Sequence, residues 1–253
     1  MELNITLIDL YILMSWVFLI AGVIQGLFGM GLPATGITLL SIFIPPVPAV
    51  GLNLIPIFLI SLFQTFQSNN PIFIISRYKY FAASMVLSGF LISFLIVYLG
   101  DALLLTLLAS VVILFSLNNL FMKPLRLNLK LDFYWQLIFG SFAGIIGGLT
   151  SIVGIISAMY LAMLNLKPKE FIDGSGFLIF IGCFSVGMGY IVMGVIEPFM
   201  IGPSLFGTFM AFLGFKLGAF IRKFVSPDNF YKILWIIFLV TGFRLAMTAV
   251  SKF

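Results

Sequence analysis

The sequence predicts an all-α integral membrane protein with an inverted-topology repeat, in which each half has a broken hairpin and three membrane-spanning helices. Three observations predict this class: the composition, the lengths of the apolar runs, and a match between the two halves. Of the 253 residues, 62% are hydrophobic and 8% are charged, against about 45–50% and about 25% in a soluble domain. So few charged side chains could not solvate the surface of a soluble fold.

Apolar runs separated by breakers give one candidate helix each. The first half contains runs at 10–28, 32–44, 52–67, 80–99 and 102–122, and the second at 134–151, 154–166, 174–193, 201–221 and 230–250. A helix of about 20 apolar residues spans a hydrocarbon core of about 30 Å. The polar connector at 123–132 separates the halves. We therefore expect a first repeat over 1–122, a cytoplasmic connector, and a second repeat over 133–253.

Two of these runs are too short to cross a membrane. Residues 32–44 and 154–166 follow the breaks Gly29-Met30-Gly31 and Ser151-Ile152-Val153, and each run would make a helix of only about 20 Å. Each run is expected to be the second part of a broken hairpin. Because backbone without helical hydrogen bonds is not tolerated against lipid, both breaks should lie inside the protein or beside a watery cavity.

The two halves match when one is shifted by 122 residues. The shift pairs Ala21 with Ala143, Gly22 with Gly144, Gly26 with Gly148, Leu27 with Leu149, Leu39 with Leu161, Pro46 with Pro168, and Phe58 with Phe180. The same shift superimposes both breaks and both short runs. These coincidences indicate an internal duplication.

Loop charges predict that the duplicated halves are inverted. The positive-inside rule makes the loops with Arg77, Lys79, Lys123, Arg126, Lys130, Lys167, Lys169, Arg222 and Lys223 cytoplasmic. Glu2, Asp9, Asp101 and Glu197 fall at the opposite ends, with Lys252 as the exception. Both termini should therefore lie outside. Inverted repeats with discontinuous helices are typical of secondary transporters, which bind substrate near the membrane midplane.

The composition also excludes several kinds of chemistry. The chain has no His and one Cys, Cys183, so it offers no imidazole site for metal or haem, and we expect no cofactor and no metal. The Lys and Arg residues are scattered among loops, which argues against a nucleic-acid partner. The expected partners are membrane lipid and a small anion. The sequence indicates neither a coupling ion nor an oligomeric state.

An anion is expected because a half-helix that begins inside the membrane exposes N–H groups and about half a positive charge at its start. Two such starts, near Leu32 and Gly154, would converge in an inverted pair, and nearby hydroxyl groups could add donors. The candidate substrate-binding residues are Gly29, Gly31, Leu32, Thr35, Asn53, Thr150, Ser151, Gly154, Ser157, Ser175, Lys216 and Arg244.

Each candidate has a structural alternative. Gly22, Gly26, Gly144 and Gly148 could serve close helix packing. Asn53, together with Gln64 and Gln67, could make hydrogen bonds between helices, and Asn53 aligns with Ser175 under the 122-residue shift. Lys216 and Arg244 either line the pathway or extend toward opposite membrane surfaces.

The motifs around the breaks resemble those of a known family. The first break reads GVIQGLFGMGLP over 22–33 and is followed by PPVPAVGLNL over 45–54. The second reads GSFAGIIGGLTSIVGI over 140–155 and is followed by LKPKEF over 166–171. This pairing resembles the sulfite exporter TauE/SafE family, and the GFR of 242–244 is similar to part of its final helix. Leu32, Ser151 and Val153 replace expected glycines, and Asn53 replaces a hydroxyl residue.

The resemblance implies transport of sulfite, sulfonates or related small organic anions. We expect a secondary transporter in the plasma (inner) membrane that works by alternating access around the two breaks. Export is favoured, because an anion that leaves a negative cytoplasm gains about 2.3 kcal/mol per charge per 100 mV. The alternative is a membrane assembly factor or an intramembrane enzyme. An enzyme would need a nucleophile with a base, paired carboxylates or a metal site.

Overall fold

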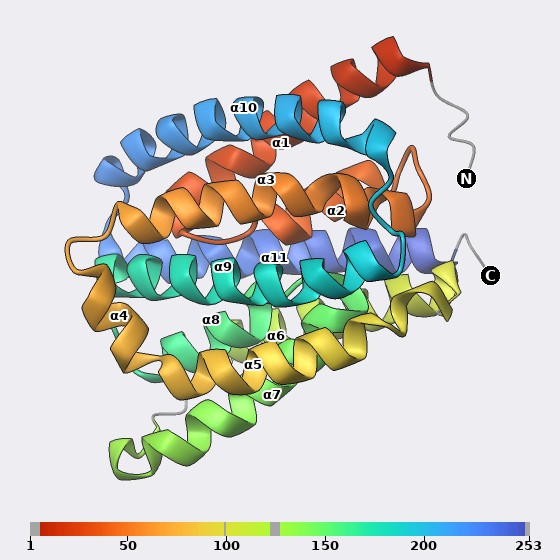
Figure 1. Ribbon diagram of the computed structural model, residues 1–253. Coiled ribbons are helices and arrows are strands. Elements are labelled where there is room, and N and C mark those ends of the chain that lie inside the picture. Colours follow the sequence, from red (N-terminus) through yellow and green to blue (C-terminus); the bar gives the residue numbers. More distant parts are fainter. Residues whose placement is uncertain (1–5, 99, 122–126, 251–253) are drawn as a thin grey trace.

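The computed structural model describes residues 6–98, 100–121 and 127–250, and these are almost entirely helical (Figure 1). The α-helices are α1 (Leu7–Phe28), α2 (Leu32–Leu40), α3 (Pro46–Phe66), α4 (Pro71–Arg77), α5 (Lys79–Ser93), α6 (Asp101–Phe121), α7 (Asp132–Thr150), α8 (Gly154–Met163), α9 (Pro168–Val192), α10 (Pro198–Ile221) and α11 (Pro227–Val250). Short 3₁₀ turns are η1 (Ile96–Tyr98), η2 (Leu129–Leu131) and η3 (Arg222–Phe224).

The helices confirm the predicted class of an all-α membrane protein. Within the described ranges, five segments are long and apolar enough to cross a membrane: Leu7–Phe28, Pro46–Phe66, Leu129–Thr150, Pro168–Val192 and Pro198–Phe224. In the most apolar 18-residue stretch of α3 and of α9, 67% of the residues are buried inside the protein. The share is 33% in α1 and in the segment formed by α10 and η3. Helices α3 and α9 therefore form the centre of the bundle.

Helix contacts are symmetric when the halves of the chain are exchanged. Helix α1 packs on α10 as α7 packs on α5, while α3 packs on α9 and α6 on α11. The ends of α1 and α7 (28 and 150), the starts of α2 and α8 (32 and 154) and the starts of α3 and α9 (46 and 168) each differ by 122 residues. This arrangement is compatible with the inverted repeat.

Several cations lie at one end of the bundle. Figure 1 shows that α1 begins and α11 ends at one end, while α4 lies at the other, which we call the α4 end. Arg77, Lys79, Lys169 and Arg222 lie where helices start or stop at the α4 end. Glu2, Lys123, Arg126 and Lys252 lie outside the described residues. The orientation of the bundle in the membrane stays a prediction.

Helix starts differ from the expected ones mainly because of proline. Helices α3 and α9 start at Pro46 and Pro168 rather than at residues 52 and 174, and each has its proline in the first turn. Proline suits this position because its fixed φ is helical and the first turn needs no N–H donor. The half-helices α2 and α8 have 9 and 10 residues rather than 13, because the chain turns away after Leu40 and Met163.

Glycines allow the outer helices to approach the bundle closely. A Cβ atom on Gly22 of α1 would lie 2.2 Å from the carbonyl oxygen of Ala211 on α10. A Cβ atom on Gly144 of α7 would lie 2.5 Å from the carbonyl oxygen of Met85 on α5. Both distances are shorter than any normal contact, so these two positions require glycine for packing.

Candidate functional site

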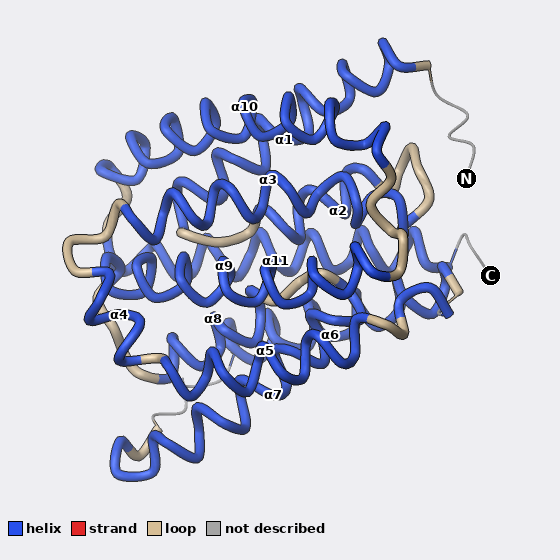
Figure 2. Tube along the Cα trace, viewed as in Figure 1, coloured by secondary structure: helices blue, strands red, loops and turns tan. Residues whose placement is uncertain are grey.

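Both breaks lie within the helical bundle, where Figure 2 shows them as short loops between helices. At the first break, Gly29 has φ 76° and Gly31 has φ 115°, and the Gly29 N–H donates to the Gln25 carbonyl (2.7 Å). Left-handed backbone of this kind favours glycine. It ends α1 and turns the chain into α2, which runs back toward the end of the bundle where α1 began (Figure 1).

The carbonyl oxygen of Gly29 accepts three side-chain hydrogen bonds. The donors are Gln25 Nε2 (3.0 Å), Gln64 Nε2 (2.9 Å) and Ser175 Oγ (2.9 Å). Gln64 also donates to the carbonyl of Ile172 (2.7 Å). The predicted site residue Ser175 thus reaches the first break from the other half of the chain, and its hydroxyl is used to hold the break.

The first turn of α2 has few free donors. The Leu32 N–H donates to Gln25 Oε1 (3.1 Å), and Pro33 has no N–H. Asn53 Nδ2 donates to the Pro33 carbonyl (2.9 Å). The start of α2 is therefore largely satisfied by the protein itself, and Leu32, a predicted ligand, already has a partner.

The second break uses the same turn with a different residue. Ser151 has φ 62°, and its N–H donates to the Gly147 carbonyl (2.6 Å), as Gly29 does to Gln25. Thr150 Oγ1 accepts the Ile152 N–H (3.2 Å), and Ser157 Oγ donates to the Val153 carbonyl (2.9 Å). The first N–H groups of α8, beginning at Gly154, have no intrahelical acceptor by helix geometry.

Three predicted site residues carry buried polar atoms that have no hydrogen-bond partner among the described residues. These atoms are Thr35 Oγ1, Asn53 Oδ1 and Ser151 Oγ. A buried hydroxyl or amide without a partner costs about 1–3 kcal/mol. Ser41, Ser68 and Trp135 also have such atoms, away from the two breaks. Predicted site residues thus hold half of the unpartnered buried polar atoms found among the described residues.

Both breaks lie along one face of α9. Gly29 contacts Ile172, while Gly154 contacts Ile179 and the Val153 side chain contacts Gly182. Spacings of three and four residues keep these positions on one side of a helix. Seven residues separate Ile172 from Ile179, so the two contact points are about 10 Å apart along the helix axis.

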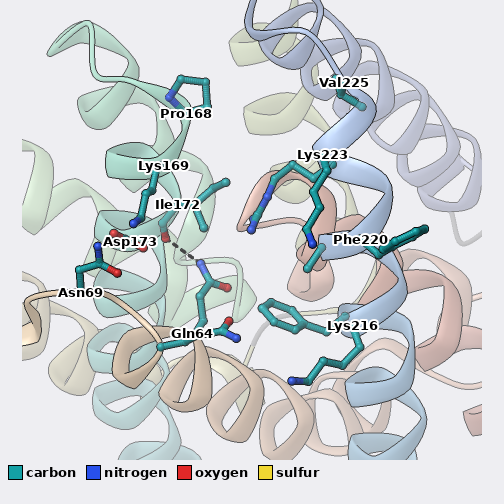
Figure 3. Close-up of a pocket in the computed structure, with 14 residues that line it drawn as sticks. Gln64, Asn69, Pro168, Lys169, Ile172, Asp173, Lys216, Phe220, Lys223 and Val225 are labelled. Atoms are coloured by element: carbon teal, nitrogen blue, oxygen red, sulfur yellow. Dashed lines mark hydrogen bonds between the residues drawn. The ribbon is translucent and has the colours of Figure 1, made fainter.

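A basic cavity of about 610 Å³ opens at the α4 end (Figure 3). It is lined by Gln64, Gln67, Asn69, Pro168, Lys169, Ile172, Asp173, Phe215, Lys216, Ala219, Phe220, Arg222, Lys223 and Val225. Lys216 is the predicted site residue in this set. The sequence did not predict Gln25, Arg222 or Lys223 as site residues, although Arg222 and Lys223 are adjacent cations at a helix end. Asp173 was the nearest candidate for a carboxylate proton carrier, because it lies close to a helix start.

Arg244 lies far from Lys216 in the fold. It lines a separate cavity of about 380 Å³ with Met247, Thr248 and the turn from Ser41 to Pro45. That turn joins α2 to α3 at the end of the bundle where α11 finishes (Figure 1). The structure therefore places the two predicted cations in cavities at opposite ends.

Two broken hairpins packed around a central helix pair define a multi-pass membrane protein of the transporter type. The particular family follows from comparison with known families. The chain belongs to the family described as sulfite exporter TauE/SafE, whose model matches residues 14–245. This is a family of membrane anion exporters and not of enzymes. Comparisons with curated proteins and with solved structures found no match.

Proposed function

We propose that this protein exports a small anion, such as sulfite or a related sulfonate, across the plasma membrane by alternating access. The observation that carries the proposal is the buried Ser151 Oγ, which has no partner among the described residues and lies three residues before the start of α8. A hydroxyl donor and the positive end of a half-helix are together suited to a small oxyanion.

The two breaks would have different tasks. At the first break, the Leu32 N–H donates to Gln25, and Gln64 donates to the Gly29 carbonyl. Because these backbone groups already have partners, the first break would have a mainly structural role. At the second break, Ser151 and the first turn of α8 would supply donors to the anion. Asn53 Oδ1 is an acceptor, so it would suit an O–H group, as in hydrogensulfite.

Alternating access would move α9 and α3 relative to the outer helices, since both breaks contact α9. The Val153 side chain lies between Gly147 and Gly182 and would occlude the second break in this state. Export needs no carboxylate proton carrier in principle, because the membrane potential itself favours the exit of an anion.

Proteoliposomes test this function. Vesicles that contain the protein and are loaded with sulfite should release it faster when the interior is made negative, whereas protein-free vesicles should not. Gly154→Leu should stop release by filling the approach to the α8 start. Gly154→Ala is the matched control, because a Cβ there meets only the Ile179 side chain, at 3.3 Å. Equal release by protein-containing and protein-free vesicles, for sulfite and for sulfonates, would contradict the proposal.

A further inference from the structure

The cations that line the basic cavity have no ion-pair partner in the part of the chain that the structure describes. Among the described residues the structure has one salt bridge, between Arg77 and Asp132. Lys169, Lys216, Arg222 and Lys223 all line the cavity, together with one acid, Asp173. Four cations and one carboxylate leave a formal charge of +3 around this space. Such a charge excess attracts anions and raises their local concentration.

Arg222 is the best-placed of these groups. Its guanidinium is half-buried, and Nη1 donates to the carbonyl of Gly26 in the last turn of α1 (3.1 Å). This bond fixes the guanidinium and leaves its other N–H groups available. A planar guanidinium matches the two oxygens of a carboxylate, sulfonate or sulfite better than an ammonium group does.

The cavity also borders the first break. Gln64 and Ile172 line its wall, and the same two residues contact Gly29. Figure 3 shows Gln64 between the Asp173 side and the Lys216 side of the cavity. An anion held in the cavity would thus lie next to the loop that joins α1 to α2.

Asp173 opposes anion binding in this cavity. It is half-buried and lines the cavity, and Figure 3 shows it beside Lys169, on the wall opposite Lys223. A negative charge beside an anion site weakens binding and so speeds release. In this cavity, Arg222 would therefore attract an anion, while the Asp173 carboxylate would repel it.

We propose that the basic cavity is a second anion site, distinct from the breaks, which binds a free small oxyanion through Arg222 while Asp173 limits its affinity. The choice of sulfite and sulfonates as ligands rests on the proposed function. The excess of cations in the cavity is a feature of the structure and does not rest on the proposed function.

Binding by the whole purified protein in phosphatidylcholine nanodiscs tests this site, with sulfite and ethanesulfonate as probes in calorimetry. The background is Gly154→Leu, in which the second break is filled. Arg222→Gln should weaken binding at least tenfold and Arg222→Lys less, whereas Asp173→Asn should tighten it several-fold. Lys130→Gln removes an exposed cation of η2 outside the cavity and should change nothing. Because Arg222 also bonds to Gly26, Lys223→Gln provides a second variant and should weaken binding about threefold.

The binding and release measurements separate the cavity site from the proposed transport function. Unchanged affinity in Arg222→Gln and Lys223→Gln would overturn the cavity site, and if sulfite release persists in proteoliposomes the proposed function still stands. Arg222-dependent binding without any release would support the site while the transport function fails. If phosphatidylglycerol in the nanodiscs abolishes binding, the cavity belongs to a lipid headgroup, and the proposal of a free oxyanion is wrong.

Discussion

Gln64 of α3 donates a hydrogen bond to the carbonyl oxygen of Gly29 (2.9 Å) and another to the carbonyl oxygen of Ile172 on α9 (2.7 Å). Gly29 is the left-handed residue that ends α1, and Ile172 belongs to the other half of the chain. One buried amide thus fixes a break in the first half against a helix of the second half. The shape of the first break depends on both halves being folded.

Gln64→Leu should therefore destabilise the protein. The substitution removes the bonds to Gly29 and Ile172 and leaves Gln25 Nε2 without the Gln64 acceptor (2.9 Å). Hydrogen bonds between membrane helices are each worth about 0.6–2 kcal/mol, so we expect the loss of three of them to cost about 2–6 kcal/mol. Thermal unfolding in detergent measures it. Gln67→Leu, at an exposed position at the end of the same helix, is the control and should change little.

Gly144→Ala should loosen the contact between α7 and α5. An added Cβ would lie 2.5 Å from the Met85 carbonyl oxygen and 2.7 Å from the Gly89 nitrogen, and backbone atoms cannot rotate away. Overpacking of this kind costs about 1–3 kcal/mol. We expect lower yield and a lower melting temperature. Gly100→Ala, where a Cβ meets nothing within 4 Å, should behave like the wild type, and similar melting of both variants would refute the packing argument.

The apolar pattern predicted most of the fold because spanning helices are defined by length and polarity alone. The 122-residue shift also paired Gly29 with Ser151, and both adopt the same left-handed turn at a helix end. What the pattern could not predict were the helix starts at Pro46 and Pro168, because the first turn of α3 is rich in proline and that of α9 is charged, and both look like breakers in the sequence.

The candidate site was less predictable than the fold. Thr35 and Ser151 were identified from their positions near the breaks, and Asn53 from its alignment with Ser175. All three have unpartnered buried atoms among the described residues. Gln25 was missed, although a lone amide four residues before Gly29 is a signal for a polar cluster. The basic cavity was missed because Lys169, Arg222 and Gln64 come from different helices, and only tertiary packing brings them together.

The α4 end should face the cytoplasm. Its cations follow the positive-inside rule, and the start of α1 and the end of α11 lie at the other end (Figure 1). On a Cys183→Ser background, Asn128→Cys should react with an impermeant maleimide only after cells are opened. Asn4→Cys and Ser251→Cys, at positions outside the described residues, should react in intact cells. If position 128 is labelled in intact cells, the predicted orientation is wrong and the α4 end faces the outside.

Lys216 and Arg244 should affect transport differently. Lys216 lies in the basic cavity, with Nζ 5.2 Å from the ring centres of Phe63 and Phe212, so Lys216→Gln should weaken the affinity for internal sulfite a few-fold. Arg244 lines the cavity at the opposite end, so Arg244→Gln should leave that affinity unchanged. Initial rates of efflux at varied internal sulfite give both values. If both variants lose the same affinity for internal sulfite, the position of Lys216 in the basic cavity does not explain its role.

Ser151→Gly should improve stability and harm binding at the same time. The left-handed backbone at Ser151 destabilises the folded state by about 1–2 kcal/mol, and glycine would remove this strain. Glycine also makes the unfolded chain more flexible, which lowers the stability by about 0.5–1 kcal/mol. The backbone change alone should therefore raise the free energy of unfolding by up to about 1.5 kcal/mol. The lost hydroxyl should weaken sulfite binding by about 1 kcal/mol, which is about fivefold. Melting in detergent and calorimetry measure the two effects.

Two further variants separate the backbone of Ser151 from its hydroxyl. Ser151→Ala keeps the strained Cβ and removes only the hydroxyl, so it should lose the same affinity and gain only the stability, about 1–3 kcal/mol, that comes from removing an unpartnered buried hydroxyl. Ser151→Gly should gain the backbone contribution in addition. Asn165→Gly relieves the other described non-glycine residue with positive φ (54°), which is exposed in the turn after α8. It should gain stability, although less because Asn tolerates this backbone better, and it should bind sulfite normally. If Ser151→Ala binds sulfite as tightly as the wild type, the Ser151 hydroxyl is not a ligand and the anion site lies elsewhere.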